Sequence, residues 1–355
     1  MERRELAIVG PFPPPLMGVS KNNEILRATL EQKGVPVVSI DTSVGQLSHS
    51  RSLGYHLARL LVNLRAASRL VRSGSRVYIV PDGGLGILYS FVHIALSSMR
   101  SREIFIHHRT FKYIDQTSLC LNLALQLSRS KATHVFLSSG MADKFQRRYG
   151  PVRHLIAGNA CFVPEGRKCI SHESSELVLG HLSNLCEEKG FFLVADLFER
   201  LAREYPRMKF KLGGPIVEER VALRLKELVS RFPSQVFHLG AIYGKAKQEF
   251  FDSLDVFVFP TLYPLEAQPN VLYEAMASGN IILATDRGCI GEMVPTWAGA
   301  VVADPSNFIE QSEAFIRASI EGQDLVAKKM AILECFAKER ARASNQFDAL
   351  INAMS

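Results

Sequence analysis

The chain has 355 residues, is 47% hydrophobic and carries a formal net charge of +7. This length suits two domains of about 150 to 200 residues, each large enough to bury a core. No apolar run approaches the roughly 18 residues of a membrane-spanning helix, and the charged amino terminus runs into a strand-like segment without the core of a signal peptide. The six cysteines lie apart, without a C-x-x-C pair or zinc-ligand spacing, which favours reduced thiols in a cytosolic protein.

The charge is divided unevenly along the chain. Residues 1–160 hold 21 Lys and Arg against 9 Asp and Glu, a balance of +12, whereas the remaining residues hold 21 against 26, a balance of −5. Such an excess favours contact between the first half and an anionic membrane surface, a phosphorylated substrate or a nucleic acid. No nucleic-acid-binding motif accompanies the charge, so we expect no nucleic acid partner.

Strand-like runs alternate with helical patterns along the first half, which predicts a parallel sheet covered by helices. The predicted strands are 6–9, 35–40, 77–80, 104–106 and 135–137, and the clearest helices are 22–32 and 53–72. The loop 10–20 (GPFPPPLMGVS) follows the first strand. Gly18 would let the backbone approach a ligand closely and Ser20 could cap the next helix, although a proline-rich loop of this kind can also be purely structural.

The helix at 53–72 lies in a basic amphipathic stretch. Between residues 51 and 76, apolar residues recur at 53, 57, 60, 61, 64, 67 and 71, with six arginines interspersed. The pattern fits a core-packing helix with a cationic solvent face, and it equally fits a helix that lies on an anionic membrane. The positive balance of this half favours the membrane.

The strand at 104–106 is followed by His107, His108, Arg109 and Lys112. A single histidine is usually structural, but two in a row at the carboxyl end of a strand, beside two cations, indicate a ligand site. Adjacent histidines cannot easily bind one ion together and no acidic or thiol partner is evident, so we expect no metal.

A polar, irregular stretch at 159–176 is predicted to link the first domain to a second α/β unit. In this unit strands and helices alternate again. The predicted strands are 177–182, 209–212, 236–239, 255–260 and 281–284, and the clearest helices are 191–205 and 218–232. The tail from 307 to 355 is predicted to be helical throughout. Lys189, before a turn glycine, and Lys247, in a helical pattern, would be surface residues if taken alone.

The stretch 260–294 carries two carboxylates, Glu266 and Glu274, separated by seven residues. Pro269 fits the first position of a helix and Gly279 fits just past its end. Glu266 is therefore predicted in a loop at the carboxyl end of a strand, and Glu274 inside the following helix. Ligands of open α/β sheets bind at this edge, and the free N–H groups of a helix start favour a phosphate.

Residues 266–279 (EAQPNVLYEAMASG) resemble the E-x7-E motif of the glycosyltransferase family 4 group, written roughly E-G-Q-P-x-V-x-x-E-A-M-A-x-G. Ala267 replaces a glycine of this motif. The loop 10–20 is similar to the group's G-P-x-P-P-x-G-G-x-S loop, with Met17 in place of the first of two glycines. The segment 104–113 is similar to H-H-H-S-F-x-Y-I, with Arg109 in place of the third histidine. Many relatives carry an arginine five or six residues before the lysine that corresponds to Lys189, whereas this chain has Ser-Asn there.

The resemblance implies a GT-B fold: an α/β protein with two Rossmann-like parallel-sheet domains facing each other across a cleft. Residues 1–160 would bind the acceptor and residues 161–335 the nucleotide sugar, and a last helix at 336–355 would return to the first domain. It implies a retaining transfer from a nucleotide diphosphate sugar to a lipid-linked or polysaccharide acceptor, without metal or cofactor. The protein would be cytoplasmic and bound to the inner face of the membrane.

The resemblance also implies roles for individual residues. Lys189 would hold the donor diphosphate, together with the N–H groups of Asn270 and Val271 behind Pro269. Arg109 or Lys247 would stand in for the missing arginine, and Gly18 would face the donor phosphates and the acceptor. Glu266 would lie near the donor sugar, Glu274 would bind the nucleotide ribose, and His107 or His108 would hold a sugar hydroxyl.

Two other interpretations stay open. The same fold serves nucleotide-sugar 2-epimerases, which release free nucleotide and need no acceptor. A non-catalytic partner subunit with a degenerate site is the second, because the phosphate-binding arginine and the glycine at position 267 are missing.

Overall fold

The computed structural model describes residues 5–14, 18–44, 53–73, 76–100, 103–165, 176–321 and 325–355. The chain divides into two compact units: unit 1 comprises Met1–Phe162 and Ala343–Ser355, and unit 2 comprises Val163–Arg342. Each unit is a parallel sheet with helices, and each is described by itself.

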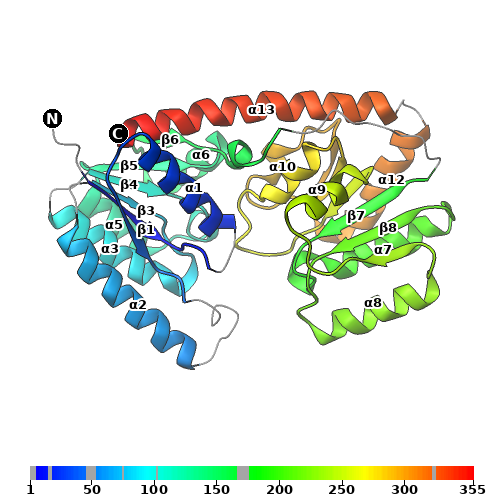
Figure 1. Cartoon of the computed structure of the whole chain (residues 1–355), viewed down its shortest axis with the longest axis horizontal. Coiled ribbons are helices and arrows are strands. Elements are labelled where there is room, and N and C mark those ends of the chain that lie inside the picture. Colours follow the sequence, from blue (N-terminus) through cyan, green and yellow to red (C-terminus); the bar gives the residue numbers. More distant parts are fainter. Residues whose placement is uncertain are drawn as a thin grey trace. The chain divides into compact units, whose positions relative to one another are not determined.

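Unit 1 contains a six-stranded sheet with the order β2-β1-β3-β4-β5-β6, in which all neighbours are parallel (Figure 1). Its strands are β1 (Leu6–Gly10), β2 (Val37–Asp41), β3 (Arg76–Ile79), β4 (Glu103–His107), β5 (Ala132–Phe136) and β6 (His154–Ile156). The first five confirm the predicted strands within a few residues. The sequence did not predict β6, because a three-residue edge strand with no buried residue carries too little of an apolar pattern.

Helices cover both faces of this sheet. They are α1 (Gly18–Gln32), α2 (Leu53–Arg72), α3 (Ile87–Met99), the single turn α4 (Lys112–Asp115), α5 (Leu119–Ser128) and α6 (Ser139–Tyr149). Successive β1 residues point to opposite faces, so Leu6 and Ile8 pack with α1, while Ala7 and Val9 share a core with α2, α3 and α5. The last turns of α13 (Leu325–Met354) belong to unit 1, because Leu350, Ile351 and Met354 are buried in the α1 core.

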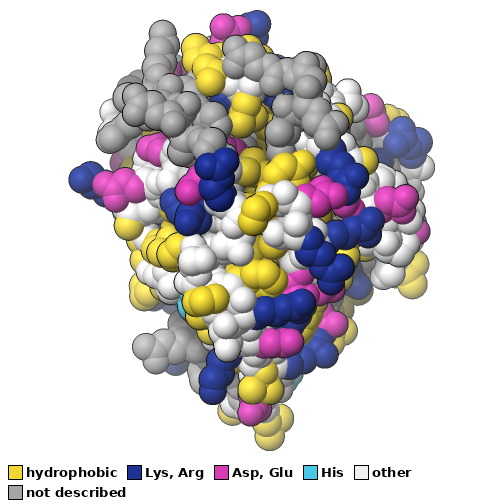
Figure 2. Space-filling view, turned by 90° about the vertical axis from the view of Figure 1, so that its right-hand side faces the viewer, with side chains coloured by type: hydrophobic (Ala, Val, Ile, Leu, Met, Phe, Trp, Pro, Cys, Tyr) yellow, Lys and Arg dark blue, Asp and Glu magenta, His cyan; other side chains and the backbone are white. Residues whose placement is uncertain are grey.

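Unit 2 contains a second six-stranded parallel sheet, with the order β12-β11-β10-β7-β8-β9. Its strands are β7 (Val178–Leu182), β8 (Lys209–Gly213), β9 (Val236–His238), β10 (Val256–Phe259), β11 (Ile281–Thr285) and β12 (Gly299–Val302). The helices are α7 (Phe191–Ala202), α8 (Glu219–Arg231), α9 (Gly244–Asp252), α10 (Asn270–Met276), α11 (Ile290–Met293), α12 (Phe308–Glu321) and most of α13. On the side of unit 2 seen in Figure 2, basic and acidic side chains lie intermingled. For example, Arg224 forms ion pairs with three acidic residues, Asp196, Glu199 and Glu227.

In both sheets the strand order reverses beside the first strand of the unit. In unit 1, β2 lies on one side of β1 and all later strands lie on the other. In unit 2, β8 and β9 lie on one side of β7, whereas β10, β11 and β12 lie on the other. Loops that leave the carboxyl ends of two strands at such a reversal diverge to opposite faces, which leaves room for a ligand between them. The loop after β1 and the loops after β7 and β10 therefore occupy the positions where an open α/β sheet binds its ligand.

Some predicted segments differ from the structure. Ser20 does not cap α1, because the helix begins at Gly18 and Ser20 lies buried in its first turn. Of the predicted linker 159–176, Asn159–Phe162 form a 3-10 helix and residues 166–175 lie outside the described residues, as does Met17. No helix among the described residues has the length and apolarity that a bilayer crossing requires.

Candidate functional site

Glu266 and Glu274 lie where the sequence predicts them. Strand β10 is a fully buried apolar run that ends at Phe259, Glu266 lies in the loop that follows, and Glu274 is in α10. Pro269 differs from the prediction by one position: its ψ of 120° makes it the N-cap residue, so Asn270 is the first helical residue. The helix ends before Gly279, whose φ of 74° suits a glycine turn.

Lys189 forms an ion pair with Glu266. Its Nζ donates to Glu266 Oε2 at 2.7 Å, and the two side chains are 23% and 13% exposed. The ammonium group also lies 4.3 Å from the centre of the Tyr263 ring, a cation–π distance. The pair joins the loop after β7 to the loop after β10, which are the two loops at the strand reversal of unit 2.

Two glycines allow the loops of this site to pack closely. Gly190 adopts φ +80°, and a Cβ there would lie 2.1 Å from the Pro260 carbonyl oxygen, so only glycine lets the Lys189 turn approach the end of β10. Gly288 adopts φ +59°, and a Cβ there would lie 2.3 Å from the Ala267 oxygen. The loop after β11 thereby supports the Glu266 loop from behind, through a hydrogen bond from the Cys289 N–H to Ala267 O at 2.7 Å.

Lys247 forms the corresponding ion pair with the second motif carboxylate. Its Nζ lies 2.6 Å from Glu274 Oε2, and the side chains are 30% and 18% exposed. Lys247 lies on α9 and Glu274 on α10, two helices in contact with each other. Each acid of the motif is thus neutralised by one of the lysines that the sequence singled out. The sequence did not predict this pairing, because no local spacing relates the partners.

The first turn of α10 adjoins this pair of loops. The N–H groups at Asn270 and Val271 precede the first intrahelical acceptors and are donors that a helix leaves for other partners. The Asn270 Oδ1 atom is buried and has no hydrogen-bond partner among the described residues. The free N–H groups can donate to an anionic group, whereas Asn270 Oδ1 can only accept a hydrogen bond.

His181 contacts Ser183, in the loop where many members of glycosyltransferase family 4 carry an arginine. It is fully buried in β7, its Nδ1 lies 2.8 Å from Val258 O, and its Nε2 lies 2.8 Å from Ser183 Oγ. Burial lowers the pKa of His181 to about 4, against the opposing effect of the Val258 carbonyl, and the Lys189 charge lowers it further. The neutral ring therefore fixes Ser183 in position. Sequence reasoning passed over His181, since a histidine within a strand carries no signal of its own.

In unit 1, His107 is buried at the end of β4 and contacts the side chains of Tyr78 and Arg109. Its Nδ1 forms a hydrogen bond with the Tyr78 hydroxyl and lies 3.4 Å from Arg109 Nη2. Because the guanidinium can only donate, Nδ1 accepts, and the proton of the neutral ring is on Nε2. Burial lowers the pKa of His107 well below its usual range, and the Arg109 and His108 charges add to this effect. The Nε2 atom is buried without a partner among the described residues.

His108 has a different environment from His107. Its ring is fully buried against Phe136 and Phe145, with ring centres 4.7 and 4.6 Å away. Both of its nitrogens have partners: Nδ1 lies 3.0 Å from the Tyr113 hydroxyl and Nε2 lies 2.9 Å from His134 Nδ1. Burial lowers the pKa of His108 well below its usual range, and the nearby His134 adds to this effect. His108 therefore stabilises the core, whereas His107 retains one uncommitted nitrogen.

Arg109 connects His107 to the loop that follows β1. With the Asn22 amide oriented to satisfy its neighbours, its oxygen accepts from Arg109 Nη1 at 3.1 Å and its nitrogen donates to Gly18 O at 3.2 Å. Gly18 begins α1, and a Cβ there would meet no atom within 4 Å. The structure therefore brings Gly18, His107 and Arg109 together at the carboxyl edge of the unit 1 sheet.

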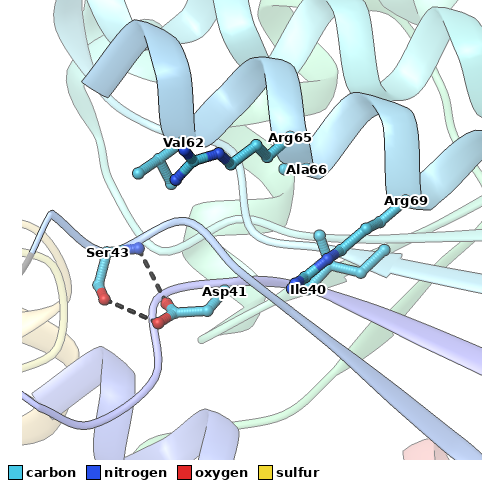
Figure 3. Close-up of a pocket in the computed structure, with 7 residues that line it drawn as sticks. All are labelled: Ile40, Asp41, Ser43, Val62, Arg65, Ala66 and Arg69. Carbon is cyan, nitrogen blue, oxygen red and sulfur yellow. Dashed lines mark hydrogen bonds between the residues drawn. The ribbon is translucent and has the colours of Figure 1, made fainter. Parts of the chain in front are cut away.

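The described residues contain no group of three or more His, Cys, Asp and Glu side chains that could hold a metal ion. A pocket of about 220 Å³ lies under α2 (Figure 3), and the view shows Arg65 and Arg69 extending from the helix towards the loop after β2. It is lined by Ile40, Asp41, Ser43, Val62, Arg65, Ala66 and Arg69. None of the predicted site residues lines this pocket, so it is distinct from both groups described above.

A comparison with known proteins finds a family match within the second unit. Residues 176–318 match the family model described as glycosyl transferases group 1, and this segment contains Lys189, Lys247 and both motif glutamates. The matched segment covers less than half of the chain. No curated protein matches the sequence.

Solved structures match over both units. HepE of Anabaena in complex with UDP has a TM-score of 0.65 at 15% identity, covering 97% of this chain and 100% of that one. The lipopolysaccharide outer core galactosyltransferase WaaB gives 0.65 at 16% identity, covering 99% and 100%. WaaG, a glycosyltransferase involved in lipopolysaccharide biosynthesis, gives 0.62 at 13% identity, covering 99% of each chain. At these identities the matches show the fold, which confirms the predicted GT-B class with two Rossmann-like domains.

Together, the family match and the shared fold support a group 1 glycosyltransferase of GT-B type. They do not favour a 2-epimerase or a non-catalytic subunit.

Proposed function

We propose that this protein is a retaining glycosyltransferase of family 4 that moves a sugar from a nucleotide diphosphate sugar to a lipid-linked or polysaccharide acceptor. The observation that carries the proposal is the pair of ion pairs, Lys189 with Glu266 at 2.7 Å and Lys247 with Glu274 at 2.6 Å. A diphosphate is repelled by bare carboxylates, and the two lysines remove this repulsion before the donor arrives. Each lysine can then turn to the phosphates and release its carboxylate to the hydroxyls of the donor.

In unit 2, Lys189 and the N–H groups of Asn270 and Val271 would hold the diphosphate, and Lys247 would add a second positive charge. In the reaction the bond between the sugar's anomeric carbon and the diphosphate oxygen breaks, and the acceptor hydroxyl oxygen forms the new bond on the same face. The hydroxyl proton leaves with the diphosphate. Positive groups fixed beside the departing diphosphate lower the barrier, since negative charge grows there as the bond breaks.

Glu266 would lie beside the donor sugar, where its charge counters the positive character of the anomeric carbon. Glu274 would accept hydrogen bonds from the two ribose hydroxyls, because a carboxylate has room for two donors. Each carboxylate is paired with a lysine in the absence of the donor and would become available for these roles when the lysine turns to the phosphates.

In unit 1, His107 would donate from Nε2 to a sugar hydroxyl, and its lowered pKa keeps the ring neutral at pH 7. His108 is the weaker candidate, since Tyr113 and His134 occupy both of its nitrogens. Arg109, beside His107 and bonded through Asn22 to the Gly18 turn, is the candidate for the missing phosphate-binding arginine.

We further propose that the reaction needs no metal, because lysines and helix N–H groups supply the positive charge at the diphosphate. The comparison structure of HepE contains UDP, and further HepE structures contain UDP with glucose and UDP-glucose. UDP-glucose is therefore the first donor to test here. The proposed location is the cytoplasm, at the inner face of the membrane.

The test is a thermal-shift panel with UDP, GDP, ADP and their hexose conjugates, in the presence of a chelator, on the wild type and on Glu274→Gln. We expect one nucleotide to raise the melting temperature of the wild type and to have much less effect on the variant. That nucleotide sugar is then offered to the enzyme with saccharide acceptors, and the configuration of the new bond is read by NMR. A panel without any shift, or a product with inverted configuration, would overturn the proposal.

A further inference from the structure

The ring of Tyr263 lies against the charge of Lys189. The Lys189 ammonium group is 4.3 Å from the centre of this ring, well inside the roughly 6 Å over which a ring face attracts a cation. The Phe259 ring is 5.9 Å away, at the end of that range. The Lys189 side chain is only 23% exposed, so the rings and Glu266 replace much of its water. The contact with Tyr263 is therefore stronger than it would be at a fully exposed site.

Backbone hydrogen bonds fix the turn that carries this ring. The Leu262 N–H donates to Glu188 O at 2.8 Å, which joins the residue before Tyr263 to the residue before Lys189. The Glu266 N–H donates to Tyr263 O at 3.1 Å, so the ring and the carboxylate belong to one turn. Both bonds join backbone atoms, so the turn keeps its place when the lysine side chain moves.

The turn is also anchored in the core of unit 2. Thr261 and Thr285 are buried, and Thr285 Oγ1, at the end of β11, donates to Thr261 O at 2.6 Å. Thr261 Oγ1 in turn accepts from the Tyr263 N–H at 3.2 Å. The ring is thus held from the ends of two buried strands, and the flexible partner of the contact is the lysine.

The second motif lysine has a weaker ring contact. Lys247 lies 6.0 Å from the centre of the Phe251 ring, at the limit of a cation–π interaction. The two lysines are otherwise alike, because each pairs with a motif glutamate, at 2.7 and 2.6 Å. The close ring therefore distinguishes Lys189, the lysine assigned to the diphosphate.

We propose that Tyr263 is the positioning residue of Lys189, and that its ring holds the ammonium group while the lysine exchanges Glu266 for the donor diphosphate. An ammonium group has three N–H donors on a flexible four-carbon chain, and the freedom of that chain opposes binding. A ring face attracts the charge as a whole, so the contact persists while individual hydrogen bonds change partner. This role deepens the proposed function and rests on it, because the diphosphate is the ligand that Lys189 is proposed to hold.

The experiment is a double-variant cycle, measured by isothermal titration with the nucleoside diphosphate that the thermal-shift panel selects. Tyr263→Leu removes the ring and should raise the Kd for the nucleoside diphosphate about five- to thirtyfold. The Kd for the matching nucleoside should change less than about twofold. In Lys189→Met the same replacement should have almost no further effect, because the ring then has no cation to hold. Equal losses in both backgrounds would overturn the inference, since Tyr263 would then act on the ligand directly or on the fold.

A second series keeps a ring at position 263. Tyr263→Phe should bind the nucleoside diphosphate within about twofold of the wild type. Phenylalanines with increasing numbers of fluorine atoms at this position retain the shape of the ring and withdraw negative charge from its face, which is the source of the attraction. The Kd should rise with each fluorine when Lys189 is present and stay constant in Lys189→Met. A constant Kd in both backgrounds would overturn the inference, even if Tyr263→Leu failed to fold.

Tyr205→Leu is the matched control. Tyr205 is also half-buried in unit 2, but it precedes β8 and so lies at the amino end of the sheet. Its replacement should leave the Kd for the nucleoside diphosphate unchanged, and a rise equal to that of Tyr263→Leu would overturn the inference. Nucleoside diphosphate binding without coupling between Tyr263 and Lys189 would overturn the inference alone. A wild type that binds no nucleoside diphosphate would overturn the proposed function as well.

Discussion

The ion pair between Lys189 and Glu266 leads to a prediction that requires a double substitution to test. Both side chains are largely buried, and their charges are 2.7 Å apart, where the attraction at an effective dielectric constant near 20 is about 6 kcal/mol before desolvation is subtracted. Replacing Lys189 by Met removes a charge-assisted contact to the diphosphate, which costs about 1.5–3 kcal/mol. It also leaves Glu266 as an unpaired negative charge beside the incoming phosphates.

The second substitution isolates that effect. In Lys189→Met/Glu266→Gln the unpaired carboxylate is gone, so the double variant should bind the nucleoside diphosphate more tightly than Lys189→Met alone. Coupling between contacting residues is about 0.5–3 kcal/mol, which corresponds to roughly 2- to 150-fold in Kd. Glu266→Gln alone should bind the diphosphate at least as well as the wild type, because Lys189 is then free for it, and should nevertheless lose transfer activity.

The measurement is isothermal titration of the four proteins with the nucleoside diphosphate that the thermal-shift panel selects, and with the matching nucleoside. Lys245→Met is the control, because it removes the same charge from an 82% exposed lysine in the same unit. Equal affinities of the double variant and Lys189→Met would refute the idea that Lys189 shields the diphosphate from Glu266. If Lys189→Met weakens binding of the nucleoside as much as binding of the nucleoside diphosphate, Lys189 does not contact the phosphates.

Three further predictions follow from the two sites. Glu274→Gln should weaken binding of the ribonucleoside diphosphate at least tenfold and binding of its 2′,3′-dideoxy analogue much less. Equal losses of affinity in titrations would show that Glu274 does not bind the ribose. Gly18→Ala should leave the melting temperature unchanged, since the added Cβ meets no atom within 4 Å, and should raise a KM; unaltered kinetics would mean that no ligand approaches there. His181, with a pKa near 4 in the fold and about 6.5 unfolded, is protonated first in the unfolded chain, so acid favours unfolding. Its share of stability, about 3 kcal/mol, is present above pH 6.5 and lost as the pH falls towards 4; urea titrations of His181→Asn should lack that part of the pH dependence.

The fold could be predicted from the sequence because its strands are buried on both faces. Runs such as 255–260 and 281–284 are continuously apolar, and β10 and β11 appear there almost residue for residue. The edge strand β6 escaped prediction for the opposite reason, since its three residues are exposed or half-buried. Pro269 shows the limit of boundary prediction: proline is accepted both as N-cap and as first helical residue, and only the dihedral angles decide.

The site was predictable as a set of residues and not as a set of contacts. Glu266 and Glu274 stand in one local pattern, whereas each partner lysine comes from another loop or helix. The pairing of β7 with β10 brings Lys189 to Glu266, and the contact between α9 and α10 brings Lys247 to Glu274. The two histidines show the same limit. The sequence treats His107 and His108 alike, but successive residues at a strand end point to opposite sides. His107 contacts Tyr78 and Arg109, whereas His108 packs in the aromatic core around Phe136.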